Sequence, residues 1–304
     1  MNRLVVVCGP TGTGKSDLAL DLAERLDGEV VNADSMQLYR GMDIGTAKLT
    51  QAERRGVPHH LLDVLDVTDK ASVAAYQRDA RAAIEEILER ARTPILVGGS
   101  GLYMQAVIDD IAFPATDSAV RARLEVELAE KGADVLWARL SERDPAAADV
   151  IERRNSRRIV RALEVIEVTG EPFTATFPVP GEPRYDAALI CLDRDTVQLD
   201  PRLAERVHAM MARGLMDEVR ALVPRGLREG FTAWRALGYR QLLGVLDGVS
   251  AEQAAVADTI IATRRFVRRQ RSWFRRDHRL TWIDAALPDL MDRCLHVVSA
   301  QSVG

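Results

Sequence analysis

The sequence predicts an α/β fold in which helices flank a parallel β-sheet and a helical subdomain is inserted into the chain. One observation is the N-terminal order of apolar strand, glycine-rich loop and amphipathic helix, with the apolar residues at 4–8. Another is that short apolar stretches recur at 29–33, 94–97 and 187–193, between segments of helical periodicity. The third is a charged, helix-rich stretch after residue 116 that contains no long β-branched run.

These patterns divide the chain into a core domain, formed by residues 1–116 and 185–304, and a helical insertion of residues 117–184. A cluster of prolines with one glycine at 178–183 closes the insertion. Within the core, helical spacing predicts helices at 16–26, 73–92, 203–223 and 251–274.

The composition is that of a globular chain. A chain of 304 residues with 47% hydrophobic residues can bury a sizeable core. No apolar run approaches the roughly 20 residues needed to cross a bilayer, and the apolar start stops at Gly9. We therefore expect no membrane contact and a cytoplasmic location. The three cysteines lack the spacing of metal ligands or redox pairs, so neither a disulfide nor a zinc site is expected.

Residues 9–16 match the phosphate-binding pattern G-x-x-x-x-G-K-[ST] without a gap. The members are Gly9, Pro10, Thr11, Gly12, Thr13, Gly14, Lys15 and Ser16. Such a loop points backbone N–H groups inward, and the following helix adds its positive end. Lys15 supplies a full charge, and Ser16 would hold a Mg²⁺ ion that bridges phosphate oxygens. The loop alone does not distinguish ATP, GTP and other diphosphates, because all present the same oxygens.

Three strand ends carry further polar residues. Asp34 follows the strand at 29–33, at the edge of a parallel sheet where ligands bind, although a solvated turn carboxylate would occupy the same position. The glycine-rich end of the strand at 94–97 could bring Ser100 close to the phosphate loop, with a plain turn as the alternative. Asp193 has the position of the second magnesium-binding aspartate of P-loop hydrolases and is a candidate for that role.

The segment 39–48 is polar, interrupted by glycines and without regular periodicity, which predicts a long ordered loop of the kind that often carries function. His59 and His60 are adjacent, and adjacent side chains do not converge on one metal ion. No cysteine or further histidine lies near them in the sequence, so a structural or hydrogen-bonding role is expected.

Arginine dominates the basic residues, since only four of the 41 are lysine. A guanidinium group can bind a phosphate through two hydrogen bonds at once. In the insertion, four arginines at i, i+3, i+4 and i+7 share one helix face, namely Arg154, Arg157, Arg158 and Arg161. A solvated charged face is the common explanation for such a stripe, but little acid balances these four, which favours an anion between them.

A second arginine stripe occupies the C-terminal part of the helix predicted at 251–274 and the residues after it. Its members are Arg264, Arg268, Arg271, Arg275 and Arg279. Trp273 and Phe274 are interleaved with them, and Asp277 is the only acid in the stretch. A salt-bridged surface helix is the alternative, but basic and aromatic residues together indicate contact with a nucleic-acid backbone.

With these residues assembled, the chain resembles the tRNA dimethylallyltransferases, also called tRNA isopentenyltransferases, over nearly its whole length. The resemblance rests on the order and spacing of motifs at residues 9–16, 34–37, 39–48, 58–63, 98–103, 236–241 and 269–275. Two positions depart from the family pattern. Ser100 stands where threonine is usual and keeps the hydroxyl, and Arg157 stands where glutamine is usual.

The resemblance implies a fold related to the small P-loop kinases, with the helical insertion facing tRNA. Members of the family move a dimethylallyl group from its diphosphate to N6 of the adenosine on the 3′ side of certain anticodons. The loop at 9–16 would therefore hold dimethylallyl diphosphate with Mg²⁺ and not a nucleotide. The expected partners are this diphosphate and the anticodon stem-loop of a tRNA, and a monomer is expected.

The candidate catalytic groups are Asp34, Lys15, Thr11 and Ser100. Asp34 would accept the N6 proton as the C–N bond forms, and the other three would stabilise the leaving diphosphate. The candidate tRNA-binding residues are Asp34, Ser35, Met36, Gln37, Ser100, Arg121, Arg157, Arg158, Arg161, Arg235, Arg240, Arg268, Arg269, Gln270, Arg271, Trp273 and Arg275.

Two other classes of function are alternatives. A small-molecule or nucleotide kinase would use the same loop for ATP, although two arginine-rich helices exceed what a small acceptor requires. A GTP-dependent switch or an RNA-binding module without chemistry is the other class. A GTPase would need the guanine-reading string [NT]-K-x-D, which the sequence does not contain.

Overall fold

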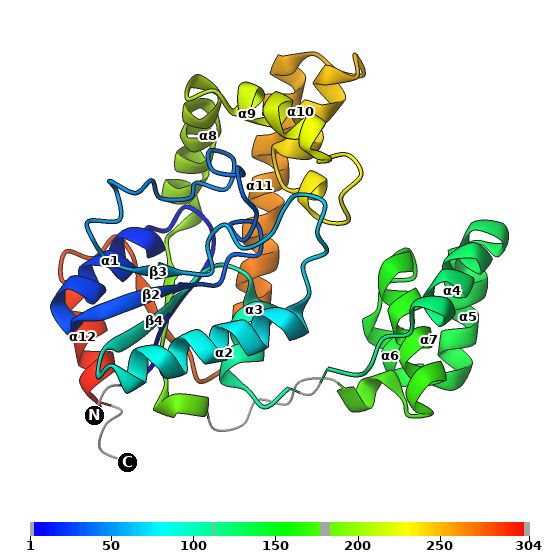
Figure 1. The fold of residues 1–304 in the computed structure, drawn as a ribbon, viewed down its shortest axis with the longest axis horizontal. Helices are drawn as coiled ribbons and strands as arrows, with labels where there is room; N and C mark the ends of the chain where they lie inside the picture. Colours follow the sequence, from blue (N-terminus) through cyan, green and yellow to red (C-terminus); the bar gives the residue numbers. More distant parts are fainter. Residues whose placement is uncertain (1–2, 112, 177–182, 301–304) are drawn as a thin grey trace. The chain divides into compact units, whose positions relative to one another are not determined.

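The computed structural model describes residues 3–111, 113–176 and 183–300. The chain divides into two compact units, one formed by Met1–Ile108 with Glu182–Gly304 and the other by Asp109–Gly181. The larger unit contains a β-sheet, and the smaller unit, the insertion, is helical (Figure 1). The insertion is thus assigned from residue 109, whereas the sequence patterns placed its start at 117. Of the proline-rich cluster at its end, only Pro183 falls within the described residues.

The larger unit is built on a six-stranded sheet with the order β3-β2-β4-β1-β5-β6. Its strands are β1 Val5–Cys8, β2 Gly28–Asn32, β3 His59–His60, β4 Thr93–Val97, β5 Ala188–Asp193 and β6 Thr281–Asp284. All neighbouring strands pair in parallel, and the four apolar stretches of the sequence form β1, β2, β4 and β5, which confirms the predicted α/β fold. The loops that follow the strands therefore meet at one edge of the sheet.

Eight α-helices are described in the larger unit. They are α1 Lys15–Leu26, α2 Val73–Glu89, α3 Gly101–Ile108, α8 Thr196–Ala212, α9 Leu215–Leu222, α10 Tyr239–Leu246, α11 Glu252–Phe274 and α12 Leu290–Ala300. Short 3₁₀ helices lie at Arg184–Asp186, Val223–Arg225 and Ala233–Arg235. Among the helices of the described ranges, none is both long enough and apolar enough to span a bilayer.

Alternate residues of the central strand pack against different helices. Val5 and Val7 of β1 lie in one cluster with Leu18 of α1 and Cys294 of α12. Val6 lies on the opposite face, in a cluster to which α2 and α3 contribute. Figure 1 shows α1 and α12 together, away from α2 and α3. Burial on both faces explains why the strands read as continuous apolar runs.

A further group of helices, α8 to α11, packs with the loop 39–48. Tyr39 and Met42 of this loop are buried with Leu215 of α9 and Tyr239 of α10. The segment 203–223 is helical as predicted, but it comprises the end of α8 followed by α9, because the chain is interrupted at Gly214, which has a left-handed φ of 97°. The predicted helix at 251–274 is confirmed as α11.

The insertion contains α4 Ser118–Lys131, α5 Ala133–Arg143, α6 Pro145–Val150 and α7 Ser156–Thr169, with a 3₁₀ helix at Phe173–Thr176. Its buried apolar residues, among them Leu124, Leu140 and Leu163, form a cluster made only of residues of this unit. Side chains of Asp117, Asp144 and Asn155 accept hydrogen bonds at the starts of α4, α6 and α7. The insertion therefore has its own core and its own helix caps.

Candidate active site

The loop of residues 9–16, called the phosphate loop after its sequence motif, connects β1 to α1 at the carboxyl edge of the sheet. Gly9, its first residue, has a φ of 131°, and a Cβ there would lie 2.0 Å from the carbonyl oxygen of Leu192 on the neighbouring strand β5. Only glycine fits this position. The Thr13 hydroxyl donates a hydrogen bond to the Pro10 carbonyl over 3.0 Å, which closes the loop on itself. Packing against β5 and this internal bond hold the curvature that the motif requires.

Lys15 lies in a cavity of about 260 Å³ whose lining also includes Thr11, Ser16, Asp34 and Arg206. Its Nζ donates to the carbonyl oxygen of Pro10 over 2.6 Å. Burial, together with the positive charge of Arg206, lowers the pKa of Lys15 to about 8. The negative charge of Asp34 opposes this lowering, but no ion pair to Lys15 is found within the described residues, so the cavity can accept an anion beside the lysine.

Arg206 of α8 is a candidate site residue that was not among those predicted from the sequence. It lines the same cavity as Lys15, and burial lowers the pKa of its guanidinium group. No ion pair to Arg206 is found within the described residues. The sequence pattern places Arg206 on the buried face of α8, because it follows the buried Leu199 and Leu203 at helical spacing. The negative charges of Asp34 and Asp17 act on Arg206, but neither forms an ion pair with it within the described residues, so its guanidinium group can bind an external anion.

Asp34 follows β2 and lines the same cavity. Its Oδ1 accepts a hydrogen bond from the Met36 amide over 2.9 Å, so the carboxylate closes a short turn. Asn32 fixes this turn from the other side, because its Oδ1 accepts from the Asp34 amide over 2.9 Å and its Nδ2 donates to the Asp34 carbonyl over 3.0 Å. The buried Tyr76 hydroxyl donates to the Asn32 carbonyl over 2.9 Å. Asp34 therefore has a fixed backbone and a fixed first carboxylate oxygen.

Ser100, at the glycine-rich end of β4, contacts the Asp34 loop. Its Oγ accepts a hydrogen bond from the Ser35 amide over 3.2 Å and lies 3.4 Å from the Ser35 hydroxyl. Thr11 and Ser100 both line a second cavity next to the first. The structure thus brings Ser100 into the region of the phosphate loop, while its hydroxyl is engaged with Ser35.

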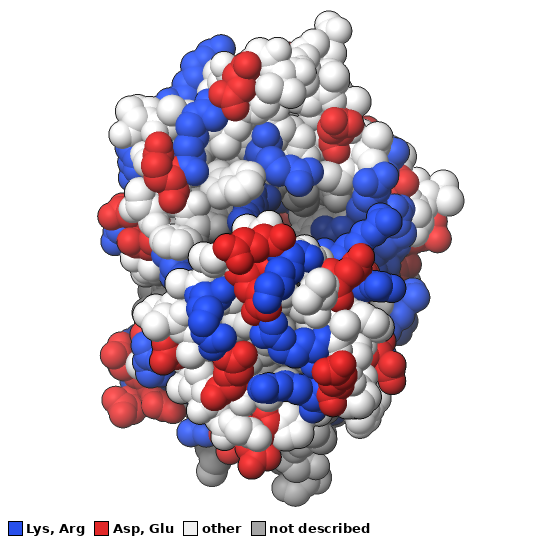
Figure 2. Space-filling model, turned by 90° about the vertical axis from the view of Figure 1, so that its right-hand side faces the viewer, with Lys and Arg blue, Asp and Glu red and all other residues white. Residues whose placement is uncertain are grey.

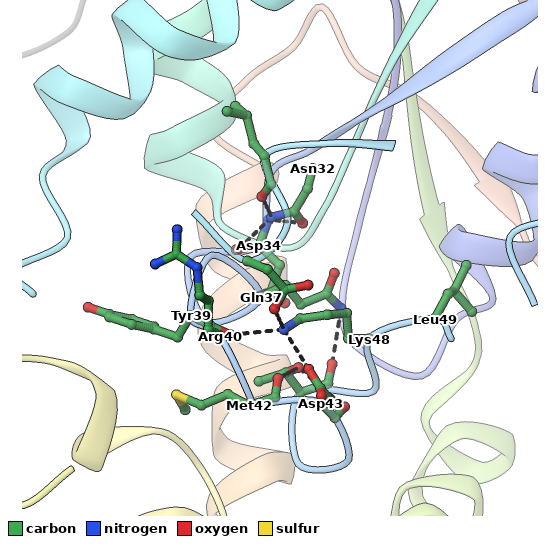
Figure 3. Close-up of polar contacts among 12 residues, drawn as sticks. Asn32, Asp34, Gln37, Tyr39, Arg40, Met42, Asp43, Lys48 and Leu49 are labelled. Carbon is green, nitrogen blue, oxygen red and sulfur yellow. Dashed lines mark hydrogen bonds and ion pairs between the residues drawn. The ribbon is translucent and has the colours of Figure 1, made fainter. Parts of the chain in front are cut away.

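The loop 39–48 is held by a buried lysine, as shown in Figure 3. The Lys48 ammonium group donates to the Tyr39 carbonyl over 2.9 Å, to Asp43 over 2.7 Å and to Asp63 over 2.6 Å. Glu218 of α9 accepts hydrogen bonds from three consecutive amides of the loop, at residues 43–45. These contacts confirm an ordered loop and explain how it stays folded without regular secondary structure.

The second cavity, of about 510 Å³, has a largely apolar wall with Met36, Leu102, Val207 and Phe266 among its residues. It shares Thr11, Asp34, Thr46, Gly99, Arg206, Phe266 and Gln270 with the first cavity. A charged compartment and an apolar compartment therefore adjoin, with Asp34 at the boundary. This arrangement suits a molecule that has an anionic group at one end and an apolar group at the other.

Comparison with known proteins identifies the family. A family model described as IPP transferase matches residues 37–277. A tRNA dimethylallyltransferase of Saccharopolyspora erythraea is 66% identical over 288 residues, which cover 95% of this chain and 93% of that protein. The chain belongs to the IPP transferase family. A tRNA dimethylallyltransferase of Mycolicibacterium smegmatis is 59% identical over 302 residues and is covered over its full length.

Solved structures of the IPP transferase family have the same fold. The tRNA isopentenylpyrophosphate transferase of Bacillus halodurans superimposes with a TM-score of 0.74 at 38% identity, over 99% of this chain and 97% of that chain. A eukaryotic dimethylallyltransferase described as acting on tRNA gives a TM-score of 0.82 at 26% identity, over the full length of this chain and 80% of that one. The resemblance inferred from the motifs is confirmed, and this chain is a prenyltransferase.

The arginines expected to contact nucleic acid fall into two groups. Those of the first group pair with acidic side chains of this chain, and those of the second are exposed. Arg271 belongs to the first group, because its Nη2 lies 2.8 Å from an Asp193 carboxylate oxygen and its Nη1 donates to the Thr196 hydroxyl over 2.7 Å. Arg121 and Arg161 both pair with Glu164, whose side chain is 0% exposed. The expectation that little acid balances the arginine stripe was wrong for Arg161. Glu164 lies one helical turn away on the same helix and is buried against it.

The second group is exposed. It contains Arg157, Arg158, Arg235, Arg240, Arg268, Arg269 and Arg275. Figure 2 shows one face on which Lys and Arg side chains are frequent, with acidic side chains between them. Arg235, Arg269 and Trp273 also line the apolar cavity, which places cations next to its apolar wall. Gln270, by contrast, is 5% exposed and lies inside the fold.

The structure also places three further polar residues for which the sequence suggested roles, namely His59, His60 and Asp193. His60 forms a 2.6 Å contact with Glu29, and His59 one of 2.8 Å with the Val57 carbonyl, so the expected hydrogen-bonding role of both is confirmed. Asp193, considered as a magnesium residue, receives two hydrogen bonds from Arg271 Nε, at 2.9 and 3.0 Å. The carboxylate of Asp193, at the end of β5, is therefore bound to Arg271 of α11.

Proposed function

We propose that this enzyme transfers the dimethylallyl group of dimethylallyl diphosphate to N6 of the adenosine on the 3′ side of the anticodon in tRNA. The observation that carries the proposal is the pair of adjoining cavities: one contains Lys15, the other has a largely apolar wall, and Arg206 lines both. A prenyl diphosphate has this division of charge. The relatives named tRNA dimethylallyltransferases and the related structure described as acting on tRNA support the acceptor.

The diphosphate is assigned to the charged cavity. Backbone amides of Gly12, Gly14 and Ser16, the N-terminus of α1, Lys15 and Arg206 offer hydrogen bonds and positive charge to its oxygens. The charge on the leaving diphosphate grows as the C–O bond breaks, so cations fixed in advance stabilise the transition state. Thr11 lines both cavities and so lies where the bridging oxygen would be placed.

A Mg²⁺ ion fits this site as a companion of the diphosphate. The described residues contain no cluster of three His, Cys, Asp or Glu side chains that would hold a metal by themselves. Mg²⁺ commonly takes only one or two protein ligands and the remainder from phosphate and water. Ser16 lines the charged cavity and would be the protein ligand. The ion would neutralise part of the diphosphate charge.

Asp34 is assigned as the group that accepts the N6 proton. The lone pair of an exocyclic adenine amine is delocalised into the ring, so removal of a proton during C–N bond formation assists the attack. Asp34 stands at the boundary of the two cavities, and only Oδ1 of its carboxylate accepts the Met36 amide. The second oxygen is the one that we assign to the adenine amine.

The exposed arginines are assigned to tRNA phosphates. An adenosine in an anticodon loop must leave its stack before N6 can enter a cavity, which costs a few kcal/mol. Phosphate contacts from Arg157, Arg268, Arg269 and Arg275 would offset this cost. We further propose that the enzyme acts on tRNA as a monomer in the cytoplasm.

The proposal is tested by incubating the enzyme with dimethylallyl diphosphate, Mg²⁺ and total tRNA, and by analysing the nucleosides by mass spectrometry. We expect dimethylallyl adenosine to form without ATP. A parallel reaction with labelled ATP tests the kinase alternative. Transfer of a phosphoryl group from ATP, without any modified adenosine from the allylic diphosphate, would overturn the proposal.

The pH dependence of diphosphate binding should report on Lys15. Its pKa of about 8 means that the free enzyme loses this charge as the pH rises through about 8, so pyrophosphate affinity should fall between pH 7 and pH 9. Calorimetric titration across this range measures the effect, with Lys15→Met as the control for titration of pyrophosphate itself. Arg206→Met removes a repelling cation and should shift the fall to higher pH. An unchanged midpoint in Arg206→Met would contradict the coupling of the two cations.

Two arginines of α11 should behave differently toward tRNA. Arg268→Ala removes an exposed cation and should raise the KM for tRNA and flatten the plot of log affinity against log salt by roughly one unit. Arg271→Ala removes the partner of Asp193 and should lower the melting temperature with little change of this slope. Filter binding across a salt series, with a melting curve for each variant, provides the measurement. If the slope changed for Arg271→Ala and not for Arg268→Ala, the assignment of the two groups would be reversed.

A further inference from the structure

Gln270 of α11 joins the phosphate-binding loop to the glycine-rich loop after β4. Its Oε1 accepts a hydrogen bond from the Thr11 amide over 3.0 Å, and its Nε2 donates to the Gly99 carbonyl over 2.9 Å. One side-chain amide therefore uses both of its polar ends on the backbones of two different loops. Both loops line both cavities of the site.

The fit between Gln270 and the second loop is close. A Cβ at Gly99 would lie 2.3 Å from Gln270 Nε2, so only glycine allows the amide to reach the backbone. The side chain of Gln270 is buried with 5% exposure, and the neighbouring Arg271 fixes the same turn of α11 to Asp193. The helix is thus held at the ends of β1, β4 and β5 together.

The glycine-rich loop continues the connection to Asp34. Ser100 follows Gly99 and accepts the Ser35 amide over 3.2 Å, and Ser35 follows Asp34. A chain of short contacts therefore leads from the phosphate loop through Gln270, Gly99 and Ser100 to the residue assigned as the proton acceptor.

We infer that Gln270 is a positioning residue for prenyl transfer, which fixes the phosphate loop at the distance from Asp34 that the transferring carbon must bridge. The inference rests on the proposed function and deepens it. Misplacement of reacting groups by about 1 Å can lower a rate about a hundredfold, because bond formation depends steeply on distance and alignment. A direct contact of Gln270 with tRNA, the role expected from the sequence, would require a buried amide to exchange both of its present partners.

The test uses the full-length enzyme and Gln270→Met, which keeps the length of the side chain and removes both hydrogen bonds. The matched control is Val267→Ala on the same helix, since Val267 is 3% exposed, packs against Leu199 and Leu203, and touches neither loop through a polar group. Three quantities are measured: the affinity for inorganic pyrophosphate by calorimetry, the KM of each substrate with kcat, and the melting temperature. Hydrogen exchange of the Thr11 amide adds a direct readout of the contact.

We expect Gln270→Met to lower kcat roughly ten- to a hundredfold, to weaken pyrophosphate binding and to leave the KM for tRNA within about twofold, while exchange of the Thr11 amide becomes faster. Val267→Ala should lose stability by a cavity effect and keep kcat and pyrophosphate affinity near those of the wild type. An increase in the KM for tRNA alone would overturn the inference in favour of a tRNA contact. Equal losses of kcat in both variants would overturn it in favour of a purely structural role.

Failure of the Gln270 role and failure of the proposed function would give different results. If the wild type binds pyrophosphate and modifies tRNA, but Gln270→Met does both equally well, only the role of Gln270 is overturned. If the wild type neither binds pyrophosphate nor uses dimethylallyl diphosphate, the proposed function is overturned and the positioning role with it.

Discussion

Lys15→Ala is expected to lower the kcat of prenyl transfer about a hundred- to a thousandfold, the scale seen when one fixed stabiliser of a developing charge is removed. Lys15 supplies the one full charge of the phosphate loop, and it lies in the cavity assigned to the diphosphate. The loss in kcat should exceed the loss in ground-state affinity for the diphosphate, because the leaving group carries more negative charge in the transition state than in the ground state. Steady-state kinetics with dimethylallyl diphosphate and tRNA measures it.

The control for Lys15→Ala is another cation near α1 that lies outside both cavities. Arg55 pairs with Asp21 of α1 over 2.7 Å, with both side chains about 44% exposed. Arg55→Ala should leave kcat and both KM values close to those of the wild type, since exposed pairs contribute little. Lys15→Ala with wild-type kcat would remove the phosphate loop from the reaction.

Asp34→Asn is expected to lower kcat roughly a hundredfold or more, the usual scale of general-base catalysis. The substitution keeps the size and an oxygen that can accept the Met36 amide, so the turn after β2 should persist. It leaves a group that cannot take a proton from N6. Single-turnover kinetics separates this loss from tRNA binding, which should change much less.

Asp193→Asn is the matched control, since Asp193 is also an aspartate at the carboxyl edge of the sheet. Its carboxylate is held by Arg271, so the substitution should lower the melting temperature and affect kcat much less than Asp34→Asn. Loss of turnover in Asp193→Asn together with near-normal turnover in Asp34→Asn would mean that the strand-end aspartate is the working carboxylate. The orientation of adenine implied by Asp34 would then be abandoned.

Sequence patterns predicted those parts of the molecule whose signals are local. The phosphate loop is one contiguous string, and the buried strands are apolar runs, so both could be found without long-range information. β3 and β6 were missed for a physical reason. β3 has two residues, and three of the four residues of β6, Thr281–Asp284, are exposed, so neither strand forms an apolar run.

The contacts that sort the arginines were not predictable in the same way. Arg271 and Asp193 are 78 residues apart, and Arg121 meets Glu164 across 43 residues. Helical spacing shows which arginines share a face, but it does not show which acids from other elements reach that face. Gln270 illustrates the same limit, because its two partners lie 259 and 171 residues away.

The separate core of the insertion has a consequence for how this protein can change. The buried leucines of the insertion contact residues of the same unit. Glu164 pairs with Arg121 and accepts a hydrogen bond from the amide of Asp117, just before α4. Substitutions in that core should therefore add independently to substitutions around the sheet. The surface of the insertion can therefore change in sequence without disturbing the packing around the sheet.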